Sequence, residues 1–132
     1  MGGAKITAPA EDKRIMMLDI DGTIVEDIPN EEAERMWNAK ALPGAVEWVN
    51  KLYEAGHYIC FITARTDEHK EATESNLKKH GFKFHSIIYN KPRRHGYSCY
   101  HYVDNAKIKG STFTGKFGEF KKKIVEIEVL PD

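Results

Sequence analysis

Short apolar runs recur along the chain, and each is bounded by polar or turn-forming residues. Four of them span residues 14–20, 58–63, 86–90 and 100–103, and runs of this length between turn signals are typical of buried β-strands. In a fifth segment, residues 123–130, apolar side chains alternate with acidic ones, which is typical of a half-exposed edge strand. The pattern therefore predicts five strands.

Helical patterns lie between the strands. One helix is expected to begin at Pro43, where a missing backbone N–H has no consequence, and to stop before Gly56. Its inward stripe consists of four apolar residues at helical spacing, namely Val46, Val49, Leu52 and Tyr53. A second helix is predicted to run to about His80, with Gly81 past its end. The stretch 24–42 is expected to hold a turn and one short helix.

This alternation predicts an α/β fold with a mainly parallel sheet and helices on both faces. Ligands of such sheets bind beyond the carboxyl ends of the strands. One connection strains the prediction, because only nine residues separate Asn90 from Tyr100, which is short for a crossover between parallel strands. Either the crossover helix is reduced to a turn there, or one of the flanking strand assignments is wrong.

The composition indicates one globular domain. The 132 residues are 41% hydrophobic and 30% charged, and a chain of this length suits a single core. We expect 1–132 to form one domain. It would have a loose leader over 1–13, a flap-like segment over 24–42 and a C-terminal tail with the edge strand over 111–132.

Several features predict a cytoplasmic protein that does not contact membranes. No apolar run approaches the roughly 20 residues of a membrane span, and no signal peptide is visible at the start of the sequence. Cys60 and Cys99 lie far apart, without a metal or redox spacing. Cys60 sits in an apolar run, where a buried reduced thiol is expected.

The net charge of zero hides an asymmetry. Residues 1–66 hold 7 Lys/Arg and 11 Asp/Glu, whereas residues 67–132 hold 13 and 9. The zero average argues against a protein held mainly by nucleic-acid phosphates or anionic lipid. The first half is nevertheless acidic and the second half basic, so the role of each charged residue depends on where the fold places it.

Two carboxylates stand at the end of the first strand. Asp19 and Asp21 share one side of the chain, which then turns sharply at Gly22 in the segment LDIDGT. Paired acids can divide labour: one acts as nucleophile and metal ligand, and the other, with a pKa raised by its neighbour, carries a proton. A plain strand-to-turn junction is the alternative. That alternative requires no second acid on a buried strand, where charge is costly.

Polar residues also follow the later strands. Thr63, with the backbone N–H groups of the next two residues, could hold an oxyanion, or could cap the following helix. Lys91 could neutralise phosphate charge, or could be a solvated loop cation. Asp104 and Asn105 carry oxygen ligands of the kind that Mg²⁺ takes, or form an ordinary turn.

The order of these motifs resembles that of the haloacid dehalogenase (HAD) superfamily. The sequence has DxDGT on its first strand, a threonine after the second, a lysine, and then an Asp-rich turn, so that the resemblance covers roughly residues 14–110. It implies a Rossmann-like core and phosphoryl transfer through an aspartyl-phosphate with Mg²⁺.

The resemblance also implies a role for each matching residue. Asp19 would attack phosphorus, and Asp21 would be the general acid/base. Thr63 would bind the transferring phosphoryl group, and Lys91 would stabilise its charge. Mg²⁺ would be held by Asp104, the Asp19 carboxylate and the Asp21 backbone carbonyl.

The candidate substrate-binding residues are Gly22, Thr23, Ala64, Arg65, Arg93 and Arg94. Basic side chains in these loops are usually solvated, but around this site they would steer an anionic substrate. Two departures from the family pattern stand out. The fourth motif is Asp-Asn rather than Asp-Asp, so Asn105 could reach the metal only through water. The short link after Lys91 leaves Lys107 and Lys109 as substitutes for the motif lysine.

Spacing resembles that of the capless class of this superfamily. Asp19 and Thr63 are 44 positions apart, and Thr63 and Lys91 are 28 apart, so neither interval holds a cap domain. An open site of this kind serves large substrates or borrows a second copy of the chain as a lid. Residues 113–120 and the tail strand could support such a homo-oligomer.

The sequence thus predicts a phosphoric monoester hydrolase, a Mg²⁺-dependent phosphatase acting on a small phosphorylated metabolite. A sugar phosphate is the leading substrate by family analogy. A phosphatase acting on nucleic-acid 3′-phosphate ends is the alternative, although a continuous basic stripe with interleaved aromatics is missing. A non-catalytic phosphate-binding module is a third, against which the intact Asp19 and Asp21 argue.

Overall fold

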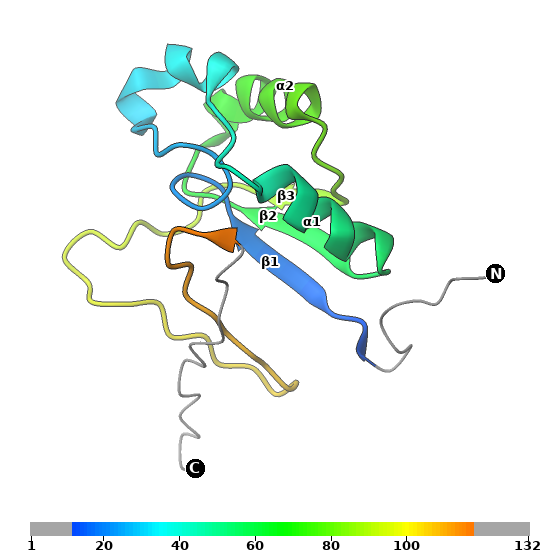
Figure 1. The fold of residues 1–132 in the computed structure, drawn as a ribbon. Helices are drawn as coiled ribbons and strands as arrows, with labels where there is room; N and C mark the ends of the chain where they lie inside the picture. Colours follow the sequence, from blue (N-terminus) through cyan, green and yellow to red (C-terminus); the bar gives the residue numbers. More distant parts are fainter. Residues whose placement is uncertain (1–11, 118–132) are drawn as a thin grey trace.

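The computed structural model describes residues 12–117 of the chain (Figure 1). Its sheet has three parallel strands in the order β1-β2-β3. The strands and the α-helices between them are β1 (Ile15–Asp19), α1 (Ala45–Glu54), β2 (Tyr58–Ile62), α2 (Lys70–His80) and β3 (Ser86–Ile88). The predicted α/β class and parallel sheet are confirmed, and each of these strands lies within two residues of its predicted span.

The two faces of the sheet differ because side chains alternate along each strand. Leu18 of β1 stands beside Phe61 of β2 in the register, and both belong to the hydrophobic core. The opposite face carries apolar side chains that are largely exposed, namely Ile15, Met17, Tyr58 and Ile88. Apolar packing in the described part of the chain is therefore concentrated on one face.

Both α-helices pack on that core face. Ala45 and Val49 of α1, and Ala72 and Leu77 of α2, are buried in the same cluster as the strand residues, and Figure 1 shows α1 lying along the sheet. Right-handed crossovers that advance in one direction place their helices on one side of a sheet. Within residues 12–117, the prediction of helices on both faces therefore holds for one face only.

The ends of the helices follow the predicted signals. Helix α1 begins two residues after Pro43, and α2 ends at His80. Gly81 then takes a left-handed conformation with φ of 88°, which an L side chain adopts only with strain. Its N–H reaches the carbonyl of Lys78 at 3.0 Å, so the last turn of α2 is closed.

The stretch between β1 and α1 forms a loop with a closed base. The N–H of Glu26 donates to the carbonyl of Lys40 at 2.9 Å, and the N–H of Lys40 donates to the Glu26 carboxylate at 2.9 Å. The loop contains the predicted short helix, which is the 3-10 helix η3 (Asn30–Asn38) with Met36 buried. We call residues 26–40 the closed loop.

Helix α2 fixes the closed loop to the body of the molecule. The buried Asn76 side chain donates from Nδ2 to the carbonyls of Trp37 and Ala39, at 3.2 and 3.0 Å. Nε2 of His80 donates to the Ala39 carbonyl at 2.7 Å. These bonds satisfy backbone groups that η3 leaves free at its carboxyl end, so the loop has a defined position.

The predicted fourth strand is wrong. Residues 100–103 form no strand, and Tyr100, Tyr102 and Val103 are more than half exposed. The nine-residue link from Asn90 is too short for a crossover helix, and the chain runs as an extended loop instead (Figure 1). The predicted tail strand 123–130 and the leader up to residue 11 lie outside the described residues.

The end of the described chain packs against α1. The Phe117 ring lies 5.1 Å from the Trp48 ring and 4.6 Å from the Phe113 ring, centroid to centroid. Part of the stretch that the sequence assigned to a subunit contact thus packs within the chain. None of the described helices has the length and apolar character needed to cross a membrane.

Candidate active site

A cleft opens where the strands end. Its first chamber has a volume of about 350 Å³, and its lining residues are Asp19, Asp21, Asp27, Ala64, Lys91, Arg93, Arg94 and Tyr100. They come from the ends of β1, β2 and β3 and from the loops that follow. Of the predicted catalytic residues, Asp19, Asp21 and Lys91 are therefore brought together, as the carboxyl ends of parallel strands allow.

Each carboxylate oxygen of Asp19 faces a different partner. The Thr23 hydroxyl donates to its Oδ2 at 3.2 Å, and Lys91 Nζ lies 3.7 Å from its Oδ1. Desolvation by burial raises the pKa of Asp19, while the positive charge of Lys91 and the Thr23 hydrogen bond lower it in part. Oδ1 thus lies in a charged cleft with a fixed orientation, as a nucleophile requires.

A tight turn returns Thr23 to Asp19. Gly22 has φ of 78°, a conformation that glycine adopts without strain. The N–H groups of Thr23, Ile24 and Val25 all point to the carbonyl of Ile20, at 3.1, 3.0 and 3.2 Å. The DGT sequence therefore builds the support of the predicted nucleophile, although Gly22 and Thr23 do not line the cleft themselves.

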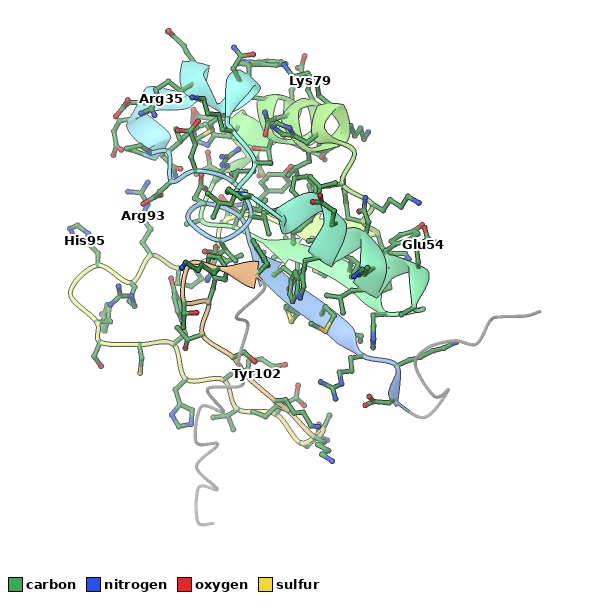
Figure 2. The ribbon with its side chains drawn as sticks, in the orientation of Figure 1. Arg35, Glu54, Lys79, Arg93, His95 and Tyr102 are labelled. Atoms are coloured by element: carbon green, nitrogen blue, oxygen red, sulfur yellow. The ribbon has the colours of Figure 1, made fainter. Side chains whose placement is uncertain are left out.

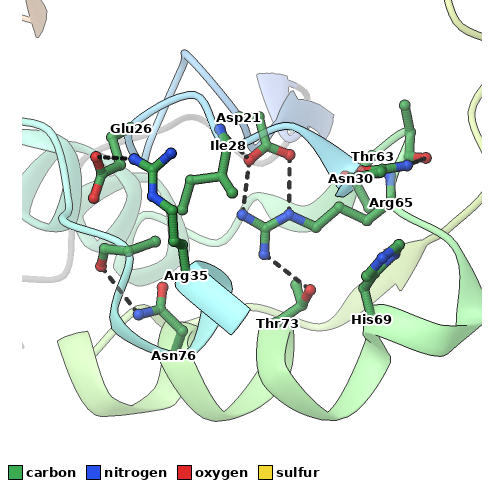
Figure 3. Close-up of polar contacts among 12 residues, drawn as sticks. Asp21, Glu26, Ile28, Asn30, Arg35, Thr63, Arg65, His69, Thr73 and Asn76 are labelled. Atoms are coloured by element: carbon green, nitrogen blue, oxygen red, sulfur yellow. Dashed lines mark hydrogen bonds and ion pairs between the residues drawn. The ribbon is translucent and has the colours of Figure 1, made fainter. Parts of the chain in front are cut away.

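Asp21 is clamped by a buried arginine (Figure 3). Arg65 donates from Nε to Oδ2 at 2.9 Å and from an Nη to Oδ1 at 2.7 Å, which is the bidentate geometry of strong charge-assisted pairs. Its other Nη donates to Thr73 on α2 at 2.9 Å. The N–H of Ile28 also donates to the Asp21 carboxylate, at 3.3 Å. The orientation of Asp21 is therefore set from behind the cleft.

The structure does not place Arg65 in the substrate rim. Its side chain is only 1% exposed, and all three guanidinium nitrogens are engaged with Asp21 and Thr73. It points inward, where Asp21 and Thr73 supply the acceptors that a buried guanidinium requires. The sequence alone gives no signal that separates this arginine from Arg93 and Arg94, which do line the cleft.

Thr63 does not line the cleft. It is fully buried, and its Oγ1 accepts a hydrogen bond from the N–H of Arg65 at 3.0 Å. Its carbonyl accepts from the N–H of Lys91 at 2.9 Å. Thr63 thus joins the ends of β2 and β3, and the next residue, Ala64, lines the cleft in its place.

Lys91 is bracketed by Asp19 and an aromatic ring. Its Nζ lies 4.4 Å from the centre of the Tyr100 ring, a cation–π distance, and the Tyr100 hydroxyl donates to the carbonyl of Pro92. Tyr100 is a cleft residue that sequence reasoning placed on a strand and missed as part of the site. The substitute lysines, Lys107 and Lys109, line no part of the cleft.

The predicted metal ligands are not brought together. Asp104 and Asn105 are exposed and line no part of the cleft. The Asp104 carboxylate accepts from the Tyr102 hydroxyl and from the N–H of Ala106, and these bonds lower its pKa. Because the fourth strand is not formed, the sheet does not carry Asp104 to the edge where Asp19 ends. Across residues 12–117, no group of three or more His, Cys, Asp or Glu could hold a metal ion.

A second chamber of about 300 Å³ adjoins the first. Its lining residues are Asp21, Asp27, Ile28, Pro29, Asn30, Glu31, Ala64 and Arg93. Arg93 Nη1 lies 3.9 Å from Glu31 Oε2, so the loop after β3 meets the closed loop there (Figure 2). Asp27, Asn30 and Glu31 were not among the sequence candidates, and their only signal was their place in the flap-like segment.

Sequence relatives of the chain include a plant protein and a bacterial one. The Stem 28 kDa glycoprotein of Glycine max is 34% identical over 86 residues, which are 53% of this chain and 34% of that protein. A putative nucleotidase of Bacillus cereus is 38% identical over 66 residues, 42% of this chain and 35% of that protein. The chain thus spans about a third of the length of these curated relatives.

A solved structure shares the fold. A chain of the Pnkp1/Rnl/Hen1 RNA repair complex superposes with a TM-score of 0.53 at 15% identity, over 64% of this chain and 28% of that one. The family profile described as HAD superfamily, subfamily IIIB (acid phosphatase) matches residues 3–110, which include every residue of both chambers. This chain belongs to the HAD superfamily, subfamily IIIB.

Proposed function

We propose that this chain is a phosphatase that hydrolyses a small phosphorylated metabolite, a sugar phosphate above all, through an aspartyl-phosphate intermediate. The observation that carries the proposal is the Asp19 carboxylate, oriented by Thr23 at 3.2 Å and facing Lys91 at 3.7 Å in a cleft with two further arginines. Such an arrangement presents a nucleophile beside cations that neutralise a phosphoryl group.

The chemistry would run in two steps. An Asp19 oxygen would form a bond to phosphorus while the bond from phosphorus to the leaving oxygen breaks, and Asp21 would hand a proton to that oxygen. Asp21 would then accept a proton from the water that hydrolyses the aspartyl-phosphate. The position of Asp21 in the walls of both chambers supports this role, and Arg65 would keep the carboxylate aimed at the leaving oxygen.

Magnesium dependence is part of the proposal. Mg²⁺ is commonly bound through one or two carboxylates, water and substrate phosphate oxygens, and Asp19 offers such a carboxylate. The donor set in residues 12–117 does not make the predicted metal centre, because Asp104 lies outside the cleft.

We expect a cytoplasmic location, in keeping with the buried free thiol of Cys60 and the exposed one of Cys99. A second copy of the chain could cover the open cleft. Neither a membrane nor nucleic acid is expected as a partner.

An assay with an aryl phosphate tests the mechanism. Turnover by the wild type is expected to need Mg²⁺ and to fall at least about 1000-fold in Asp19→Asn and about 100-fold in Asp21→Asn. Asp12→Asn, at an exposed aspartate before the amino end of β1, is the matched control and should retain full activity. Turnover that survives Asp19→Asn would rule out the aspartyl-phosphate route.

Two alternatives predict other outcomes. A nucleic-acid-end phosphatase would prefer a 3′-phosphorylated oligonucleotide to any sugar phosphate, and the fold shared with a chain of the RNA repair complex makes this comparison worth running. A non-catalytic module would bind inorganic phosphate and turn over no monoester.

A further inference from the structure

We propose that the second chamber receives the leaving group and selects one that is rich in hydroxyl groups and carries no further phosphate. This inference rests on the proposed phosphatase function and names the substrate class that the site would accept. It is carried by the position of the chamber, by its charge and by the hydrogen-bonding groups of its wall.

The two chambers form one continuous cleft. They share Asp21, Asp27, Ala64 and Arg93, and Asp19 and Lys91 belong to the first alone. A phosphoryl group placed against Asp19 and Lys91 would therefore direct its leaving oxygen past Asp21 into the second chamber. The proton donor proposed for the leaving group stands at this boundary.

Charge divides the cleft in the same way. The first chamber has as many cationic side chains as carboxylates in its wall, and its cations can face a phosphoryl dianion; they are Lys91, Arg93 and Arg94 against Asp19, Asp21 and Asp27. Arg93 is the one cationic side chain in the wall of the second chamber as described, and it already faces Glu31 at 3.9 Å. Three carboxylates, those of Asp21, Asp27 and Glu31, outnumber this single cation, so a leaving group with further phosphates would be repelled.

The polar groups of the second chamber match hydroxyls. Within residues 12–117, the Asp27 carboxylate has no hydrogen bond or ion pair, although it lines both chambers. The Asn30 amide donates to the Ala64 carbonyl at 3.1 Å, which leaves its oxygen as an acceptor, and Arg93 supplies donors. A sugar hydroxyl both donates and accepts, so it can use this mixed wall.

The wall offers less to a nucleobase or a quaternary ammonium group. No aromatic ring lines the second chamber in the described structure, whereas stacking of bases and capture of such cations rely on aromatic faces. The Tyr100 ring belongs to the first chamber and is occupied by Lys91 at 4.4 Å. The hydroxyl-rich leaving group is therefore the best match.

Substrate selection by Asp27 variants tests the inference. The panel is an aryl phosphate, a hexose phosphate, a nucleoside monophosphate, a 3′-phosphorylated dinucleotide and phosphoethanolamine. The wild type should give its highest kcat/KM with the hexose phosphate. Asp27→Ala should lower that kcat/KM about 10- to 100-fold, the range for a hydrogen bond to a charged group, and this loss should exceed the loss on the aryl phosphate, which has no hydroxyl groups to bind. Asp12→Asn is the control, and thermal unfolding checks that each variant is folded.

A second variant tests the charge. Asp27→Asn keeps the shape and removes one negative charge, so kcat/KM for the dinucleotide should rise by about 3- to 10-fold at low salt. Equal losses on the aryl and hexose phosphates in Asp27→Ala would overturn the inference, as would a wild-type preference for phosphoethanolamine or for a nucleotide. Failure to hydrolyse even the aryl phosphate would refute the phosphatase function itself, and the two failures are thus distinct.

Discussion

The loops that follow β2 and β3 both bring arginine to the cleft, yet they are built in opposite ways. After β2, Arg65 is buried and every guanidinium nitrogen has a partner within 3.0 Å. After β3, Arg93 is half-exposed, and its ion pair with Glu31 spans 3.9 Å. One loop is a rigid support, and the other is an adjustable rim.

The difference shows that residue type alone does not assign a role at this site. A buried guanidinium is committed to fixed partners, because leaving its donors unpaired is costly. An exposed one keeps water as an alternative partner, so it can release Glu31 when a substrate arrives. We expect substitutions in the first loop to act on stability, and substitutions in the second to act on substrate binding.

The largest effect should come from Arg65. Arg65→Met should lower the free energy of unfolding by about 3–5 kcal/mol, because it leaves Asp21 and Thr73 without their buried donor. Arg93→Met, the matched change in the exposed loop, should lower it by less than about 0.5 kcal/mol. Urea unfolding followed by circular dichroism measures both. Similar losses in the two variants would show that the loops do not differ as the structure indicates.

The next largest effect should come from Lys91. Its side chain is 18% exposed, which lies between the buried Arg65 and the half-exposed Arg93. Lys91→Met should lower kcat/KM on an aryl phosphate by about 100-fold, since it removes the cation beside the nucleophile, while the unfolding free energy changes by less than about 1 kcal/mol. Lys107→Met serves as the control and should keep wild-type activity. A loss of activity at Lys107 or Lys109 instead would return the motif lysine to the later loop.

The smallest effect concerns how the stability of the metal-free protein depends on pH. Burial raises the pKa of Asp19 in the folded state, so the folded protein binds this proton more tightly than the unfolded chain does. The protonated Asp19 side chain therefore favours the folded state. This contribution to stability is fully present at pH below the ordinary pKa of 3.8 and is lost as the pH rises through the pKa of the folded state. Asp19→Asn should therefore melt higher than the wild type at pH 7.

The expected gain is about 1–2 °C, kept small because the Asp19 side chain is 39% exposed and solvent screens its charge. The gain should shrink as pH falls towards 4. Thermal melts in the presence of a chelator, from pH 4 to pH 7, measure it. A gain that stays constant with pH would show that the carboxylate is not the cause.

Local signals were enough to predict the parallel core. The apolar runs of β1, β2 and β3 and the glycine after α2 are strong because period, length and cap agree. The DGT turn after Asp19 could be predicted for the same reason, since it needs a glycine at one defined position. These features depend on neighbours within a few residues along the chain.

The misplaced features depend on distant partners. Tyr100 lies in a short apolar run that predicts a strand, but no crossover of sufficient length carries it back to the sheet. Arg65 reads as a rim residue, and only the packing of α2, which brings Thr73 beneath it, shows that it turns inward. Asp27 has no motif of its own, and its role arises from the loop that brings it into both chambers.

The closed base of residues 26–40 has a consequence for how this protein can be altered. Glu26 and Lys40 are hydrogen-bonded to each other, so the two ends of the loop are joined directly. Lengthening a loop whose ends are already fixed adds only a small entropic cost. Ile28, Met36 and Ala39 anchor the segment in the core, so its exchangeable part is the exposed side that carries Glu31, Glu32 and Glu34. Evolution or an engineer could rewrite it to change what the cleft accepts while the strand that bears Asp19 stays as it is.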